Sequence, residues 1–319
     1  MTSSSSTTQK ARFDARVLIA LLVTLVLWAS AFVGIRAGLS SYTPGHLVLL
    51  RFLIASFALL VYALLTRMRL PVYRDIPALL LLSFIGITVY QVALSFGEQR
   101  VSAGAASLLV ATVPCFTALF ASFFLHERLR VWGWIGIITS FIGVFVVVLG
   151  QGQGLHFEPD ALLVLLAALA ESVYFVMQKP FLRKYSGLEL ATYTIWGATL
   201  FMCIYAPGLV QQVRTAPVGA TLAIVYLGLF PAAIAYVTWA YALSRMSASI
   251  TTTFLYILPV ITIVLAWPLL GEIPSLLSLV GGVVVILGVA LVNARGKRQK
   301  SHVQVSAEDA RQDEKQLTH

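Results

Sequence analysis

The segments PCFTALFASFFLHE, residues 114–127, and PVITIVLAWPLLGE, residues 259–272, both begin with proline and end with glutamate at the same spacing. They lie 145 positions apart, and the same shift places Arg100-Val-Ser-Ala on Arg245-Met-Ser-Ala. Over residues 92–147, 13 of 56 positions are identical to their shifted partners. Apolar composition alone produces some identities, but it does not produce matched proline, arginine, glycine and glutamate. The chain therefore contains an internal repeat.

The composition indicates a protein that lipid solvates. The chain has 319 residues, is 59% hydrophobic and only 11% charged, and its mean hydropathy is +0.89. A soluble domain carries about 25% charged residues. The formal charge of +9 comes from short basic clusters between apolar runs, so we expect no nucleic-acid partner. Cys115 and Cys203 lie inside apolar runs, where we expect buried thiols without disulfide or metal-ligand spacing. We expect no cofactor and no metal.

The apolar runs predict an all-α membrane protein with ten transmembrane helices. A helix needs about 20 apolar residues to cross the hydrocarbon core. Ten runs meet that requirement, approximately at residues 17–37, 46–65, 76–97, 102–124, 132–150, 161–179, 189–209, 218–242, 248–270 and 276–293. The predicted organisation is an N-terminal segment 1–16, a first repeat 17–150, a second repeat 161–293 and a disordered tail 294–319.

Lysine and arginine orient these spans. With the N-terminus in the cytoplasm, eighteen basic residues fall on the cytoplasmic side and three on the other side. We therefore expect both termini in the cytoplasm and a multi-pass protein of the bacterial inner membrane. Each repeat has five spans, an odd number, so the second repeat enters the membrane from the opposite side. Such inverted repeats are typical of secondary transporters that alternate access to a site near the midplane.

Pro114 and Pro259 occupy equivalent positions near the middle of the fourth and ninth predicted spans. Each removes a helical hydrogen bond and frees a carbonyl four residues earlier. The kink is either a packing feature, which is common in membrane helices, or a bend point for gating. Recurrence at symmetric positions favours gating slightly.

These features resemble the EamA repeats of the drug/metabolite transporter superfamily. In each half the fourth span has a mid-helix proline and ends in glutamate, and the first spans carry LWASAF (27–32) and LAESVY (169–174). Segments at Tyr90-Gln91 and YVTW (236–239) are similar to amino-acid exporters of this family. The resemblance implies export of aromatic and other amino acids by alternating access, with a central cavity lined by spans 1, 3, 6 and 8. One departure is Glu171, where the resemblance implies an aromatic residue.

The candidate substrate-binding residues are aromatic and polar side chains deep inside the predicted spans. Aromatic walls suit amphipathic ligands and cations, and tyrosine hydroxyls at that depth need partners. Plain packing between helices is the alternative for each single aromatic. The set is Trp28, Ser30, Tyr90, Gln91, Glu171, Tyr174, Tyr236 and Trp239. Trp239 lies nearer a span end, where a place in the interfacial aromatic belt competes.

Glu171 is the acid nearest a span centre, where an ionised carboxylate is costly. It could bind a substrate ammonium group, couple transport to protons, or form a structural hydrogen bond. Arg51 could pair with Glu171 or bind a substrate carboxylate; its position near a span end slightly favours snorkelling to the interface. We expect Glu98 and Arg100 to be solvated or paired at the outer surface, and the span-ending Glu127 and Glu272 to form interfacial hydrogen bonds.

Alternative functions stay open at this point. An acid among aromatics also suits a multidrug or organic-cation exporter. An intramembrane enzyme is disfavoured, because HExxH and GxSxG are absent and the five histidines fall at the edge of a predicted span, in predicted loops or in the tail. A membrane scaffold or receptor is the remaining option. No Walker motif is present, so ATP does not drive transport directly. The sequence leaves open the preferred substrate, the choice between proton coupling and facilitated diffusion, the resting conformation, and the oligomeric state, a monomer included.

Overall fold

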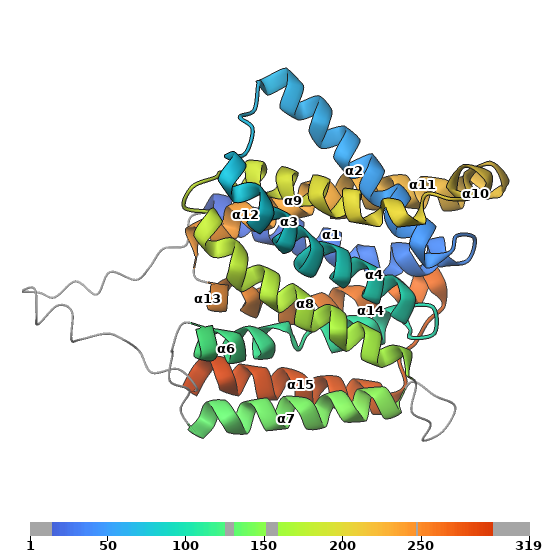
Figure 1. Cartoon of the computed structure of the whole chain (residues 1–319). Coiled ribbons are helices and arrows are strands. Elements are labelled where there is room, and N and C mark those ends of the chain that lie inside the picture. The colour runs from blue at the N-terminus through green and yellow to red at the C-terminus, as the bar shows by residue number, and fades with distance from the viewer. Residues whose placement is uncertain (1–14, 125–130, 151–158, 247, 296–319) are drawn as a thin grey trace, which may run out of the picture.

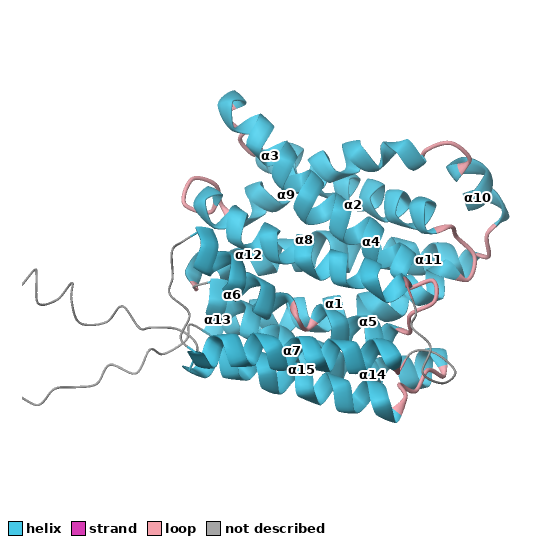
Figure 2. Cartoon of the chain, turned by 60° about the horizontal axis from the view of Figure 1, so that its bottom comes forward, coloured by secondary structure: helices cyan, strands magenta, loops and turns pink. Residues whose placement is uncertain are grey.

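A computed structural model describes residues 15–124, 131–150, 159–246 and 248–295, and within these ranges every regular element is a helix (Figure 2). The predicted all-α class is confirmed for this part of the chain. The predicted terminal segments and the span-ending Glu127 fall wholly or almost wholly outside it. The elements are α1 (Ala15–Leu39), α2 (Pro44–Thr66), η1 (Tyr73–Asp75), α3 (Ile76–Ser83), η2 (Phe84–Val89), α4 (Tyr90–Gly97), α5 (Ala103–Val110), α6 (Val113–Phe124), α7 (Val131–Leu149), α8 (Asp160–Phe181), α9 (Gly187–Met202), η3 (Cys203–Tyr205), α10 (Leu209–Thr215), α11 (Val218–Leu227), η4 (Gly228–Ile234), α12 (Ala235–Arg245), α13 (Ala248–Thr253), η5 (Phe254–Ile257), α14 (Leu258–Leu270) and α15 (Leu276–Arg295).

Seven helical stretches of the described residues are long and apolar enough to cross a membrane. They are Ala15–Leu39, Pro44–Thr66, Tyr73–Gly97, Ala103–Phe120, Asp160–Phe181, Gly187–Tyr205 and Val218–Arg245. Three shorter apolar helices, Val131–Val147, Phe254–Leu270 and Leu276–Leu291, coincide with the other predicted spans. Many large apolar side chains are exposed on the outside of the bundle, as a surface solvated by lipid requires. The ten-span count, the sidedness and the inverted repeat stay predictions.

Helices α7 and α15 lie side by side at one edge of the bundle (Figure 1). Their glycines allow a close crossing: a Cβ on Gly143 would lie 2.7 Å from the carbonyl oxygen of Gly281. A Cβ on the equivalent Gly288 would lie 2.6 Å from the carbonyl oxygen of Gly136. As the residue numbers of the contacts increase along α7, those of their partners decrease along α15. The two helices therefore run antiparallel. These contacts are reciprocal under the 145-residue shift, which supports the internal repeat.

A second reciprocal feature is a π-helical stretch in the third predicted span of each half. The first is η2 and the second is η4. The 145-residue shift places the first stretch on residues 229–234, within the second. Short π segments inside α-helices are frequent at functional sites, because they change the direction of side chains and free backbone groups.

The seventh predicted span, residues 189–209, ends earlier than expected. Helix α9 begins with a capping box, in which Ser186 Oγ accepts from Glu189 N at 3.2 Å, and it ends at Met202. Pro207 and Gly208 interrupt the helical conformation, and Gly208 has φ +84°, a conformation that glycine adopts without strain. The separate α10 follows, and the sequence analysis missed it. Cys115 is buried as expected, whereas Cys203 is exposed, so that expectation was wrong.

The two ends of the bundle carry different polar contacts, and we name each end by one residue. At the Lys184 end, Lys184 and Tyr185 both donate hydrogen bonds to the carboxylate of Asp75. Val72 N donates to Tyr185 Oη at 3.1 Å. The hydrogen bond with Asp75 raises the pKa of Lys184. Lys179 donates to the carbonyls of Leu243 and Met246, where a cation suits the C-terminus of α12.

At the Arg36 end, one side chain ties three parts of the chain together. Arg36 Nε lies 2.8 Å from Glu272 Oε1. Its Nη1 donates to the carbonyls of Glu98 and Gln99, each at 2.7 Å. Ala103 N donates to Glu272 Oε2 at 3.0 Å, which confirms the hydrogen-bonding role expected for this acid. We call these contacts the Arg36 latch. It joins α1 to the α4–α5 connection and to the chain after α14.

Candidate functional site

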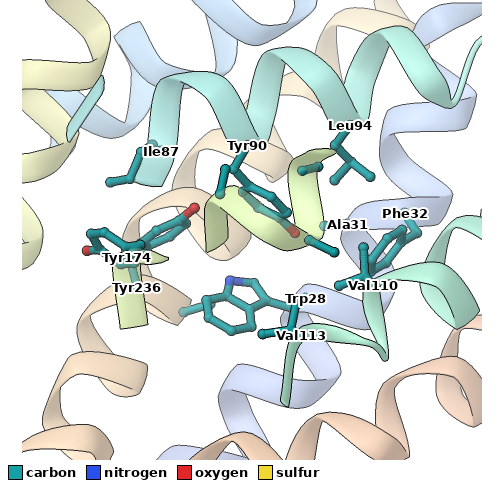
Figure 3. Packing of buried hydrophobic residues seen from close by; sticks show 14 of the residues in the cluster. Trp28, Ala31, Phe32, Ile87, Tyr90, Leu94, Val110, Val113, Tyr174 and Tyr236 are labelled. Carbon is teal, nitrogen blue, oxygen red and sulfur yellow. The ribbon is translucent and has the colours of Figure 1, made fainter. Parts of the chain in front are cut away.

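Five buried aromatic side chains from three helices pack together, and Figure 3 shows Trp28, Tyr174 and Tyr236 among them. Trp28 comes from α1, Tyr174 and Phe175 from α8, and Tyr236 and Trp239 from α12; we call them the aromatic cluster. Ring centroids are 5.1 Å apart for Trp28 and Trp239, 5.6 Å for Trp28 and Tyr236, and 4.5 Å for Phe175 and Trp239. Trp239 is 0% exposed, so the interfacial-belt alternative for it was wrong.

The two π-helical stretches shape this cluster. Trp28 Nε1 donates to the carbonyl of Pro231, inside η4, at 3.3 Å. On the other side, Gly86 in η2 lies against Tyr174, and a Cβ there would come within 2.3 Å of the tyrosine ring. Tyr174 Oη in turn lies 3.3 Å from Thr194 Oγ1. Both irregular segments therefore set the position of aromatic side chains.

A chain of polar groups runs beside the cluster. Arg51 Nη1 donates to Gln91 Oε1 at 2.9 Å, and Gln91 Nε2 donates to Tyr236 Oη at 3.0 Å. Gln91 and Tyr236 are related by the 145-residue shift, so this bond joins equivalent positions of the two halves. Arg51 is 1% exposed, and the snorkelling that the sequence favoured for it is wrong. Helix α2 starts at Pro44, two residues earlier than predicted, which places Arg51 deeper in the span.

Glu171 lies on α8, one helical turn before Phe175, and is 3% exposed. It is within electrostatic range of the hydroxyls of Tyr90, Tyr174 and Tyr236. No described basic side chain forms an ion pair with it. A carboxyl group in this position is available for a cationic group or a proton that enters the site.

A small cavity adjoins the cluster and the polar chain. It is lined by Trp28, Ala31, Phe32, Ile35, Arg51, Tyr90, Gln91 and Leu94. Its volume is about 10 Å³, space for about one water molecule. An amino acid does not fit, so this is a closed form of the protein. Figure 3 shows Tyr90 directed from α4 toward Trp28, with Phe32 on the side of Val110 and Val113.

Both predicted kink prolines lie just after interruptions of their helices. Helix α5 ends at Val110 and α6 begins at Val113, one residue before Pro114. In the second half a 3-10 stretch, η5, separates α13 from α14, in which Pro259 is the second residue. The break between α5 and α6 lies close to Phe32 of the cavity (Figure 3).

A larger cavity of about 560 Å³ opens at the Arg36 end. Arg36, Gln99 and Glu272 line it together with neighbours on α1 and α14. Helix α1 passes from the aromatic cluster through the small cavity to this opening, since Trp28, Ile35 and Arg36 follow one another along it. The Arg36 latch therefore lies between the small central cavity and the outside of the bundle.

The structure does not bring all predicted residues together. Ser30 lies 2.7 Å from Tyr226 Oη and also donates to Leu27 O, so it joins α1 to α11 rather than the cluster. Glu98, expected to be solvated or paired, is 0% exposed and neither carboxylate oxygen has a hydrogen-bond partner among the described residues. Arg100 forms the expected ion pair, 3.6 Å from Asp160.

Sequence reasoning missed Phe175 and undervalued Arg51. Phe175 follows Glu171 by four residues, so helical spacing alone places both on one face of α8. Arg51 is the one basic residue inside the second predicted span. An ionisable residue at such a depth is a functional candidate by default.

Comparisons with known proteins place this architecture in a family. The sequence matches the family described as EamA-like transporters twice, over residues 15–149 and 159–294. It is 46% identical over 274 residues to the protein named Uncharacterized transporter YdfC of Bacillus subtilis (strain 168), covering 86% of this chain and 90% of that protein. It is 42% identical to the Probable terminal-alkyne amino-acid exporter of Streptantibioticus cattleyicolor, covering 88% and 95%.

More distant relatives agree with this placement. The protein named Uncharacterized inner membrane transporter YedA of Escherichia coli (strain K12) is 28% identical, covering 86% of this chain and 89% of that protein. A crystal structure with 20% sequence identity superposes with a TM-score of 0.62, covering 88% of this chain and 97% of that one, and so shares the fold. With the family matched in both halves and close relatives named as transporters, the chain belongs to the EamA-like transporter family and is a multi-pass membrane transporter, not an enzyme.

Proposed function

We propose that the chain is a secondary transporter that exports amino acids, aromatic ones included, or similar small amphipathic metabolites across the inner membrane. The observation that carries this proposal is Glu171, a carboxyl group buried next to the aromatic cluster without an ion-pair partner among the described residues. An acid beside aromatic rings suits an ammonium group attached to an apolar body. The relative named as a probable amino-acid exporter supports the same substrate class.

In this proposal the substrate contacts come from the aromatic cluster and the polar chain. Aromatic rings surround the apolar part of the substrate, and Tyr90, Gln91 and Tyr236 offer hydrogen-bonding groups. Glu171 holds the ammonium group or carries a proton. Ser30 stays outside this set, because its hydroxyl is already engaged with α11.

Alternating access requires the small cavity to widen and to open to one side at a time. Opening at the Arg36 end separates α1 from Glu272 and from the carbonyls of Glu98 and Gln99. The helix interruptions beside Pro114 and Pro259 are the bend points, since fewer helical hydrogen bonds resist bending there. The Lys184 end opens in the other half of the cycle.

A second candidate, an organic-cation exporter, is favoured by the same pairing of Glu171 with aromatic rings. Buried Arg51 opposes it, because a guanidinium group beside the small cavity repels a ligand with only positive charge. The two candidates therefore differ in whether a carboxylate on the ligand improves binding.

The test is transport by purified protein in liposomes loaded with labelled amino acids, with and without a pH gradient. We expect amino-acid flux in the wild type and a loss of gradient-driven flux in Glu171→Gln. Exchange of labelled for unlabelled substrate distinguishes the two roles of this acid. It survives in the variant if Glu171 carries only a proton, and it is lost if Glu171 binds the substrate.

Glu189→Gln is the matched control, because glutamine also serves at the third position of a capping box. We expect wild-type flux from it. Binding of cationic dyes with no amino-acid flux would overturn the proposal in favour of the organic-cation candidate.

A further inference from the structure

Arg51 is a full positive charge buried inside a membrane span. Its side chain lines the small cavity, and the residue is 1% exposed. No described acidic side chain lies within ion-pair distance of it. Its own neighbour Phe52 offers a ring centroid 5.8 Å from the guanidinium carbon, which stabilises the cation only in part. A buried cation without a counter-charge is strongly unfavourable, so we expect an anionic group to pair with it.

The hydrogen bonds of Arg51 are one-sided. Nη1 donates to Gln91, which fixes the orientation of the guanidinium plane. Nε has no partner, and no described residue accepts from Nη2. The Nε–Nη2 edge is one of the edges that bind a carboxylate through two parallel hydrogen bonds. The protein thus orients the guanidinium group through Nη1 and leaves a carboxylate-binding edge of it without a hydrogen-bond partner among the described residues.

Glu98 is the acid that could balance Arg51 from within the protein. It lies within electrostatic range of Arg51 but is not hydrogen-bonded to it. Burial raises the pKa of the Glu98 carboxyl well above its ordinary value, against the opposing effects of Arg36 and Arg51. Burial thus opposes the ionised form of Glu98, and neither of its carboxylate oxygens is hydrogen-bonded to Arg51.

Arg51 and Glu171 are both neighbours of the same two tyrosines. Tyr90 and Tyr236 are within electrostatic range of both charged groups. Figure 3 shows Tyr90 and Tyr236 near Trp28 of the aromatic cluster. A positive group and a carboxyl group that share two phenol rings as neighbours match a ligand that carries both charges and an apolar side chain.

We infer that the Nε edge of Arg51, oriented by Gln91, binds the carboxylate of a zwitterionic substrate whose ammonium group faces Glu171. This inference rests on the proposed function and specifies it: the transporter selects α-amino acids over amines of the same shape. Arg51 is then a specificity-determining residue. The carboxylate enters when the cavity widens, and it takes the place of the single water that the closed form admits.

The first test needs no variant. Equilibrium binding to the purified wild-type protein is measured for the twenty common amino acids, and the tightest binder is compared with its methyl ester and its decarboxylated amine. Both analogues keep the ammonium group and the side chain. Charged hydrogen bonds are worth enough that we expect both to bind about 10- to 100-fold more weakly than the amino acid.

The second test repeats these measurements with Arg51→Gln and Arg51→Lys. We expect Arg51→Gln to weaken amino-acid binding about 10- to 100-fold and to leave binding of the amine unchanged or stronger. Arg51→Lys keeps the charge without the planar fork, so we expect an intermediate loss. Arg214→Gln on α10 removes the same charge from an exposed position that does not line the small cavity, and this variant should bind like the wild type.

The outcomes separate the inference from the proposed function. If none of the twenty amino acids binds, the amino-acid form of the proposed function fails and the inference with it. If an amino acid and its amine bind the wild type equally well, the inference is wrong while the proposed function stands. Equal amino-acid affinity of folded Arg51→Gln and wild type contradicts the inference in the same way. If Arg51→Gln does not fold, the wild-type comparison with ester and amine decides alone.

Discussion

Replacing Arg36 with glutamine should open the bundle at the Arg36 end. The substitution removes the ion pair with Glu272 and the two hydrogen bonds to the carbonyls of Glu98 and Gln99. A hydrogen bond to a charged group contributes about 1.5–3 kcal/mol when it is buried. The two side chains of the ion pair are 29% and 21% exposed, so water replaces part of the loss. We therefore expect the closed form to lose about 2 kcal/mol, which is about a 30-fold shift toward the open form.

The assay is chemical labelling of a cysteine placed at Ala31, a small residue that lines the central cavity. Cys115 and Cys203 are first replaced, because the exposed Cys203 would react on its own. A membrane-impermeant maleimide is added from the side of the Arg36 end. We expect Arg36→Gln to raise the labelling rate about 30-fold, the population shift derived above.

Glu272→Gln should raise the rate less than Arg36→Gln, since it leaves the two bonds from Arg36 to carbonyls in place. Arg214→Gln is the control and should label at the rate of the parent protein. A folded Arg36→Gln protein that is labelled at the rate of this control would refute the claim that the Arg36 latch holds the bundle closed.

Two glycine substitutions test the packing on which the site depends. Gly86→Ala places a methyl group 2.3 Å from the ring of Tyr174, so we expect it to lower the free energy of unfolding by about 1–3 kcal/mol and to weaken substrate binding. Gly143→Ala sets a methyl group 2.5 Å from a backbone nitrogen of α15, which cannot turn aside, and we expect a similar loss of stability without a direct effect on binding. Gly219→Ala is the control for both, because nothing lies within 4 Å of its Cβ position, and thermal unfolding in detergent is the measurement. Equal unfolding temperatures for all three variants would contradict this account of the packing.

The positions of the helices were predictable from the sequence because membrane spans need long apolar runs. The helix interruptions were predictable too, since Pro114 and Pro259 stand at equivalent places in the repeat. The extent of α9 was not, because residues 203–209 are apolar enough to extend the run. Only the Pro207-Gly208 pair signalled that the helix had ended.

Depth and direction of side chains were harder to predict than the spans. Trp239 seemed to lie near a span end, but α12 continues to Arg245, so the residue falls in the interior. Ser30 shares a helix with Trp28, but side chains two residues apart on an α-helix do not lie on the same face. The Ser30 hydroxyl contacts Tyr226 instead of the aromatic cluster. The π-helical stretches also turn side chains in a way that no simple apolar pattern encodes.

The Arg36 latch could not be predicted from the sequence, because it depends on tertiary contacts. Its partners Glu98-Gln99 and Glu272 come from two segments far from Arg36 and from each other in the sequence, so only the packed bundle brings them to one side chain. The volume of the central cavity likewise depends on how neighbouring helices interdigitate, not on the composition of any one of them.

The most direct test of the central claim is an experimental structure of the protein with a transported amino acid bound. We predict density for the ligand between Trp28, Tyr90 and Tyr236, with its carboxylate on Arg51 and its ammonium group toward Glu171. The closed cavity of about 10 Å³ should be enlarged in that structure. A ligand found only in the cavity of about 560 Å³ at the Arg36 end, with the aromatic cluster still closed, would contradict the claim.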